Sequence, residues 1–92
     1  MYVLNANSLA KQHALTQLTT DIVHYNADVA VLSETHLNER HSDSKMTISG
    51  FDLVRRDRVG RPGGGVAIYT ARQVPLDSQQ YKLILLVTTA ER

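Results

Sequence analysis

The apolar residues recur with different periods along the chain, and these periods predict its secondary structure. A short β-favouring run at residues 2–4 ends in turn-forming and cap-forming residues at 5–8, which predicts a first strand. Apolar residues at spacings of three and four between residues 9 and 25 predict an amphipathic helix. The uninterrupted apolar run at 29–32 is typical of a strand covered on both faces. These segments predict a βαβ unit, in which the two strands are parallel.

The next part of the chain predicts a loop and an antiparallel hairpin. Residues 38–50 are polar and mixed, as expected of a surface loop. Residues 51–57 alternate between apolar and polar, the glycine-rich residues 58–65 predict a turn, and residues 66–70 form a second β run. We therefore expect a hairpin whose loop carries several arginines.

The last residues predict a linker and a further strand. Residues 71–81 contain Pro75, and residues 82–89 hold a continuous apolar run. One helix cannot cover both faces of a sheet whose strands are this apolar, so apolar faces and strand edges should remain exposed. We expect residues 1–92 to be the N-terminal portion of a single, larger α/β domain, or a short product derived from one.

Composition and charge narrow the class of protein. The chain has 92 residues, of which 42% are hydrophobic and 21% charged, as in folded globular segments. The net charge of +1 does not by itself predict a polyanion partner. However, residues 1–54 carry three basic and six acidic side chains, whereas residues 55–72 carry five arginines and one aspartate. This uneven distribution of charge predicts a local basic loop.

The sequence also carries information on the cellular compartment of the protein. It has no cysteine, which excludes a disulfide-linked partner and agrees with a reducing compartment. It has no apolar stretch near the roughly 20 residues that a membrane span needs, and its start does not resemble a signal peptide. We expect an intracellular protein, in the nucleus or the cytoplasm, that does not bind membranes.

The candidate chemistry lies where the two parallel strands end. Glu34 follows the apolar run directly, and an acid at the end of a buried strand needs a partner. Glu34 can cap the residues after it, pair with an arginine, or bind a hard cation. Parallel strands bring Asn5 to the same sheet edge, where α/β proteins usually build their sites. Carboxylate and amide oxygens suit Mg²⁺, which keeps several waters and needs few protein ligands.

Three sequence blocks carry a resemblance to a known superfamily. They are "LNANSL", "ADVAVLSETHL" and "GFDLVRRDRVGRPGGGVAIYT", and they extend over roughly residues 2–70. In order, spacing and wording they resemble the start of endonuclease/exonuclease/phosphatase domains, most closely the apurinic-type endonuclease of non-LTR retrotransposons. The resemblance implies the front part of a four-layered α/β sandwich (DNase-I-like). It also implies Mg²⁺-dependent or Mn²⁺-dependent cleavage of DNA phosphodiesters, within a reverse transcriptase polyprotein.

The resemblance also implies roles for individual residues. Glu34 matches the glutamate that binds the catalytic metal, and Asn5 matches the asparagine that positions the metal and the scissile phosphate. Asn7 is expected to support this metal site. Thr35 is expected to make a structural hydrogen bond that holds the turn.

The basic loop and the histidines have competing interpretations. The arginines can form a solubilising face or contact the DNA backbone, and we assign phosphate contact to Arg58 and Arg61. The glycines favour a hairpin turn over a phosphate-binding loop, because no Gly-Lys-Ser/Thr follows and the run opens a strand. The four histidines lack zinc-site spacing and are predicted to be solvated surface residues.

The sequence departs from the family pattern in one large respect. The family needs a histidine general base oriented by an aspartate and a later cluster of Asp and Asn, but the chain contains neither an Asp-x-Asn nor a Ser-Asp-His sequence. Catalysis by this polypeptide alone is therefore not expected. Two other hypotheses remain: a non-catalytic remnant that at most binds nucleic acid weakly, and another phosphoesterase of the superfamily, such as a phosphatase or an RNA deadenylase.

Overall fold

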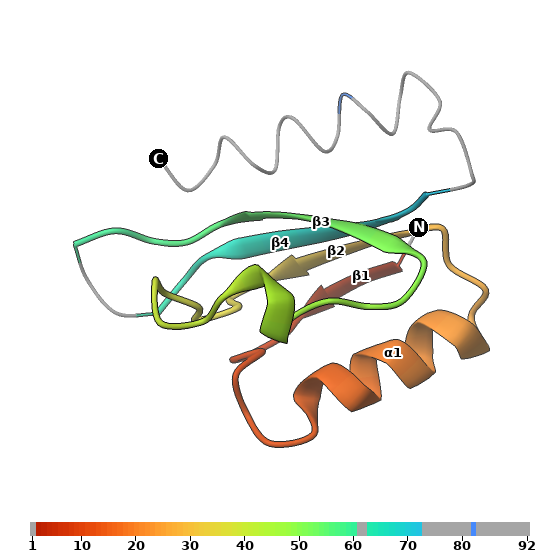
Figure 1. Ribbon diagram of the computed structural model, residues 1–92, viewed down its shortest axis with the longest axis horizontal. Helices are drawn as coiled ribbons and strands as arrows, with labels where there is room; N and C mark the ends of the chain where they lie inside the picture. The colour runs from red at the N-terminus through yellow and green to blue at the C-terminus, as the bar shows by residue number, and fades with distance from the viewer. Residues whose placement is uncertain (1, 61–62, 73–81, 83–92) are drawn as a thin grey trace.

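The protein is described by a computed structural model, which covers residues 2–60, 63–72 and 82 in the description that follows. A sheet lies at its centre, with a helix against one of its faces (Figure 1). The elements in chain order are β1 (Tyr2–Asn5), α1 (Ala14–His24), β2 (Val29–Ser33), the short 3₁₀ helix η1 (Asp43–Lys45), β3 (Phe51–Arg56) and β4 (Val66–Ala71).

The predicted βαβ unit is confirmed. Strands β1 and β2 pair in parallel with α1 between them in the chain, and Asn5 stands opposite Ser33. The helix begins at Ala14, later than the sequence predicts, and ends at His24. The backbone of His13 explains the late start. His13 has a left-handed conformation with φ 68°, which an α-helix cannot continue through, so α1 begins only at the next residue. Before it, the Leu9 N–H donates to the Thr35 carbonyl oxygen at 2.8 Å, which ties this segment to the residue after Glu34.

The predicted hairpin is confirmed, and β4 takes a central place in the sheet. Strands β3 and β4 pair antiparallel, and β4 also pairs antiparallel with β2, which gives the order β1-β2-β4-β3. Because β2 and β4 have neighbours on both sides, their apolar residues are the most buried of the sheet. The end of β2, which leads into Glu34, therefore lies beside the start of β4.

The two faces of the sheet are covered unequally. On the helix side, Leu18 and Ile22 of α1 belong to one apolar cluster with Leu32 and Tyr69. On the opposite side, Val29, Val31 and Ile68 form a smaller cluster. That opposite face also carries Val3 and Val54, which are 70% and 50% exposed. As expected from one helix and several apolar strands, apolar residues remain at the sheet surface.

The segment before β3 corrects the prediction of a simple surface loop. Residues 38–50 include η1, and their apolar residues Met46 and Ile48 are buried in the main core. The Tyr69 hydroxyl donates to the Met46 carbonyl oxygen at 2.6 Å. Burial raises the pKa of Tyr69 to about 12. Part of the polar segment is thus anchored to the sheet.

Some expectations fall on parts of the chain outside the described residues. These are the linker after Arg72, the strand at 82–89 apart from Lys82, and the position of Arg61. Among the helices of the described part, none has the length and apolar character needed to cross a bilayer.

Candidate functional site

The ends of β1 and β2 bring Asn5 and Glu34 to the same edge of the sheet, as the βαβ prediction requires. Asn5 is in register with Ser33, the residue before Glu34. Beyond the strands, the Ala6 N–H donates to the Ser33 carbonyl oxygen at 2.8 Å, and the Ser8 N–H donates to the Glu34 carbonyl oxygen at 2.9 Å. The two candidate ligands are therefore held on neighbouring, hydrogen-bonded segments.

Glu34 differs in one respect from the buried acid that its sequence position suggests. Its side chain is exposed, because the apolar strand ends at Ser33 and the chain turns outward. Within the described residues, Glu34 takes part in no ion pair, so the interpretation as an arginine partner is not supported there. Its carboxylate is presented to solvent at the sheet edge, where a ligand can reach it.

Asn7 supports Asn5 through its backbone. The Asn7 N–H donates to Oδ1 of Asn5 at 3.1 Å, which fixes the orientation of the Asn5 amide. An amide oxygen has two lone pairs, so Oδ1 can still accept one more partner. The Asn5 side chain is exposed, and that partner can come from solvent.

Strained backbone gathers at this edge. Asn7, Ser8, Glu34 and His36 have φ values of 45°, 83°, 51° and 58°, a region that residues with a side chain rarely adopt. Such conformations cost about 1 to 3 kcal/mol each and collect at ligand sites and active sites. The sequence gives no warning of this strain at Glu34, because glutamate does not favour a positive φ.

Thr35 holds the turn through its backbone. Its N–H donates to the Gly65 carbonyl oxygen at 3.3 Å, and its carbonyl oxygen accepts from the Leu9 N–H. Its side chain is fully buried, and the hydroxyl has no hydrogen-bond partner among the described residues. The turn is thus held by hydrogen bonds of the Thr35 peptide groups.

The donor set fits a hydrated hard cation. The described residues contain no cluster of three or more His, Cys, Asp or Glu side chains that could enclose a metal ion. Asn5 and Glu34 instead offer one amide oxygen and one carboxylate, both exposed. Mg²⁺ keeps several waters and is often bound through one or two protein carboxylates beside a phosphate. The chemistry of these two side chains fits such an ion and does not fit a closed structural site.

Arg55 is a structural residue, which corrects its grouping with the loop arginines. Its guanidinium pairs with Asp57 at 2.6 Å and with Asp43 at 3.2 Å. It also donates to the carbonyl oxygens of Asn38, at 2.9 Å, and His41. The hydrogen bonds to Asp57 are the main reason that the pKa of Arg55 is raised. Arg55 thereby ties the segment after Glu34 to β3.

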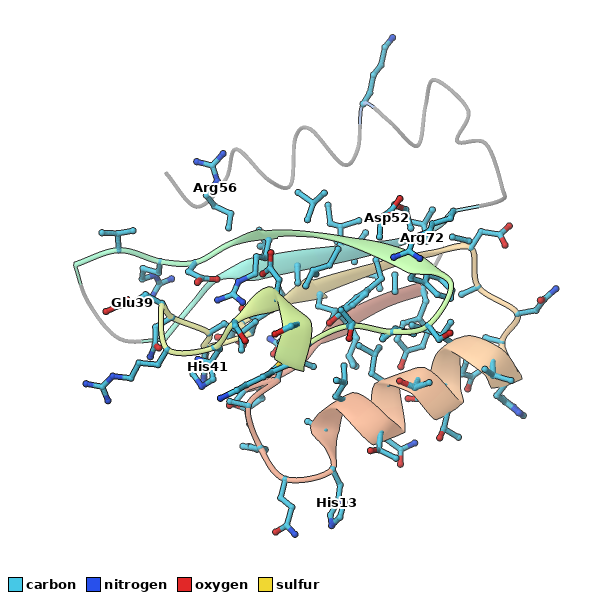
Figure 2. The ribbon with its side chains drawn as sticks, viewed as in Figure 1. His13, Glu39, His41, Asp52, Arg56 and Arg72 are labelled. Carbon is cyan, nitrogen blue, oxygen red and sulfur yellow. The ribbon has the colours of Figure 1, made fainter. Side chains whose placement is uncertain are left out.

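The sequence contains a signal for the structural role of Arg55. The period-two alternation of β3 places Arg55 on the same face as Phe51 and Leu53, which are partly buried in the main core. Arg56 falls on the other face and is exposed. Figure 2 shows Arg56 on the side of the sheet away from α1.

The side chains of Arg58 and His36 lie beside the glycine tract Gly63–Gly65. Both side chains are half-buried, whereas His13 and His24 are exposed as predicted. A β-carbon on Gly63 would lie 4.0 Å from Nη1 of Arg58 and 4.0 Å from Nε2 of His36. Because the His36 N–H also donates to the Gly64 carbonyl oxygen at 2.8 Å, His36 and Arg58 meet beside the glycines.

Comparison with known proteins identifies the class of fold. No protein-family model and no curated protein matches the chain. Among solved structures, an AP endonuclease from Archaeoglobus fulgidus matches with a TM-score of 0.56 and 20% sequence identity. The match covers 76% of this chain and 27% of that endonuclease, so the chain spans about a quarter of its neighbour's length. The sheet, the helix and this likeness define a mixed α/β fold of the DNase-I-like type.

Proposed function

We propose that this chain is the front part of a Mg²⁺-dependent DNA endonuclease domain of the kind found in non-LTR retrotransposons, with Mn²⁺ as an alternative ion. The observation that supports the proposal is the juxtaposition of Asn5 and Glu34 at adjacent strand ends of a DNase-I-like fold. The retrotransposon assignment, and with it a reverse transcriptase in the same polyprotein, is supported by the wording of the three sequence blocks.

In this proposal, the residues of the chain bind the ion and orient the phosphate. Glu34 supplies the charged ligand, and Asn5, oriented by the Asn7 N–H, supplies a neutral oxygen. A bound Mg²⁺ supplies charge stabilisation on the phosphoryl oxygens and the leaving group. Arg58, and by the same reasoning Arg61, contributes positive charge toward the DNA backbone. The partner is duplex DNA, contacted through its phosphates, in the nucleus or cytoplasm.

The proposal does not assign catalysis to these 92 residues alone. The sequence has no Asp-x-Asn and no Ser-Asp-His segment to supply the general base and the second acidic cluster. This observation favours a second candidate function for the chain by itself, namely a non-catalytic segment that binds nucleic acid weakly. The two candidates differ in whether cleavage returns when the later motifs are present.

A plasmid-nicking assay tests the proposal. In Mg²⁺, a polypeptide that carries this segment together with the later family motifs should nick supercoiled DNA, and the 92-residue chain should not exceed background. Glu34→Gln should lower nicking by roughly 100-fold or more, because it removes the charged metal ligand. The matched variant Glu39→Gln changes an exposed glutamate in the following turn and should leave nicking unchanged. Unaltered nicking by Glu34→Gln contradicts the assignment of Glu34.

A further inference from the structure

The glycine tract Gly63–Gly65 is overlaid by polar side chains from elsewhere in the chain. A β-carbon on Gly64 would overlap the guanidinium of Arg58, and one on Gly65 would stand 2.6 Å from Oγ1 of Thr35. At Gly63, Nη1 of Arg58 and Nε2 of His36 each lie 4.0 Å from the β-carbon position. All three glycines also have positive φ values, of 82°, 64° and 89°. The absence of side chains at 63 and 64 thus leaves the space that Arg58 and His36 occupy.

The two side chains reach this space from different segments. Arg58 follows β3 by two residues, and His36 follows the end of β2. The His36 backbone is fixed, because its N–H donates to the Gly64 carbonyl oxygen. Since Nη1 and Nε2 are equally far from one point, their separation is at most twice 4.0 Å. Both nitrogens therefore lie beside the Gly63 position, at the sheet edge that carries Glu34.

We propose that Arg58 and His36, which cover the backbone of Gly63 and Gly64, form a binding subsite for a backbone phosphate of nucleic acid. A guanidinium donates several N–H groups in a planar fork, and an imidazole donates one. A phosphate has enough acceptor oxygens to take hydrogen bonds of about 2.8 Å from both. The subsite goes beyond the expected role of Arg58 because it adds His36 and the glycines.

This inference rests on the proposed function only for the source of the phosphate. Binding of phosphate itself requires no metal ion and no cleavage. The nearby carboxylate of Glu34 repels an anion in the metal-free chain. Neutralising it by Glu34→Gln should therefore strengthen phosphate binding by a few-fold, although the same substitution should abolish nicking. The metal site and the phosphate subsite thus predict opposite effects of Glu34→Gln.

Amide NMR spectra of the 92-residue chain test the subsite in metal-free buffer, first with inorganic phosphate and then with a short DNA duplex. Phosphate should cause saturable shifts at Gly63, Gly64 and His36. Arg58→Ala and His36→Ala should each weaken binding by about 10-fold, as expected for hydrogen bonds to a charged group. Arg56→Ala removes the same charge from an exposed position on the other face of β3 and should change binding less than about twofold.

The results separate a subsite from general charge attraction. Equal weakening by Arg56→Ala and Arg58→Ala overturns the proposal, as does full phosphate binding by both Arg58→Ala and His36→Ala. Unchanged amide shifts away from the glycine tract show that each variant is folded. A duplex that binds with the same dependence on Arg58 and His36 supports nucleic acid as the source. If only inorganic phosphate binds in this way, the assignment to a backbone phosphate is wrong.

Discussion

Gly65 and Thr35 fit together so closely that a β-carbon on Gly65 would lie 2.6 Å from the Thr35 hydroxyl oxygen. The same two residues are joined by the hydrogen bond from the Thr35 N–H to the Gly65 carbonyl oxygen. Thr35 directly follows Glu34, and Gly65 directly precedes β4. This contact therefore helps to hold the turn that follows Glu34 against the start of β4.

Gly65→Ala should destabilise the fold much more than Gly60→Ala. Both glycines have φ 89°, a left-handed backbone in which alanine is strained by about 1 kcal/mol. A β-carbon on Gly60 has nothing within 4 Å, whereas one on Gly65 meets Thr35. Overpacking should add about 1 to 3 kcal/mol to the loss in the free energy of unfolding, measured by urea denaturation. Thr35→Ala in the Gly65→Ala background should recover part of the lost free energy of unfolding. Equal losses for Gly65→Ala and Gly60→Ala contradict the contact between Gly65 and Thr35.

Thr35→Val should leave the protein as stable as before or more stable. The hydroxyl is fully buried without a partner in the described structure, and such a group costs about 1 to 3 kcal/mol. Valine has nearly the same shape, and it removes the unpaired group. The urea midpoint should stay constant or rise. A loss of more than about 1 kcal/mol indicates instead that the hydroxyl makes a stabilising hydrogen bond.

Arg55→Met should destabilise the protein by about 2 kcal/mol, because it leaves Asp57 and the loop carbonyl oxygens without their donor. The Arg55 side chain is 12% exposed, and that of Asp57 is 21% exposed. Asp43→Asn should cost less than about 0.5 kcal/mol, since the Asp43 side chain is 70% exposed. Arg56→Met, at an exposed position of the same strand, is the matched control. Similar thermal unfolding of both arginine variants contradicts the structural role of Arg55.

Stability should fall as the pH rises from 10 to 12, in part because of Tyr69. Its pKa is raised by burial from 10.0 to about 12, so the unfolded chain releases the proton first. The stabilisation is complete below pH 10 and is lost as the pH approaches 12, with a total of about 2 to 3 kcal/mol. Burial also raises the pKa of Tyr2, which adds a change of the same sign.

Tyr69→Phe isolates this contribution. The variant should lose about 1 kcal/mol at neutral pH with the hydrogen bond to Met46, and its stability should fall less steeply above pH 10. Tyr25→Phe changes a ring that is 65% exposed and serves as the control. The slope between pH 10 and 12, from urea titrations, is the measured quantity. A slope equal to that of the unsubstituted chain contradicts the assignment.

The arrangement of Asn5 and Glu34 could be predicted because it depends on periodicity alone. The spacing of apolar residues predicts the βαβ unit, and parallel strands must end at one edge. The start of α1 could not be predicted in the same way. Leu9 continues the apolar pattern, but His13 has a left-handed backbone that keeps the α-helix from starting before Ala14. The spacing of apolar residues contains no signal for that conformation.

The roles of the arginines in the basic loop could also be predicted only in part. Counting arginines identifies a charged segment but does not separate Arg55, which is anchored in β3, from Arg58, which lies over the glycines. The alternation of β3 contains part of that information. The meeting of His36 with Arg58 depends on the pairing of β2 with β4 and has no signal within either segment.

The most direct measurement of the central claim is Mn²⁺-induced broadening in amide NMR spectra of the 92-residue chain. Mn²⁺ prefers the same oxygen ligands as Mg²⁺, and its unpaired electrons broaden nearby resonances. We predict selective broadening at residues 5–8 and 33–36, its loss in Glu34→Gln, and its retention in Glu39→Gln. The same selective broadening in Glu34→Gln as in the unsubstituted chain would contradict a metal site at Asn5 and Glu34.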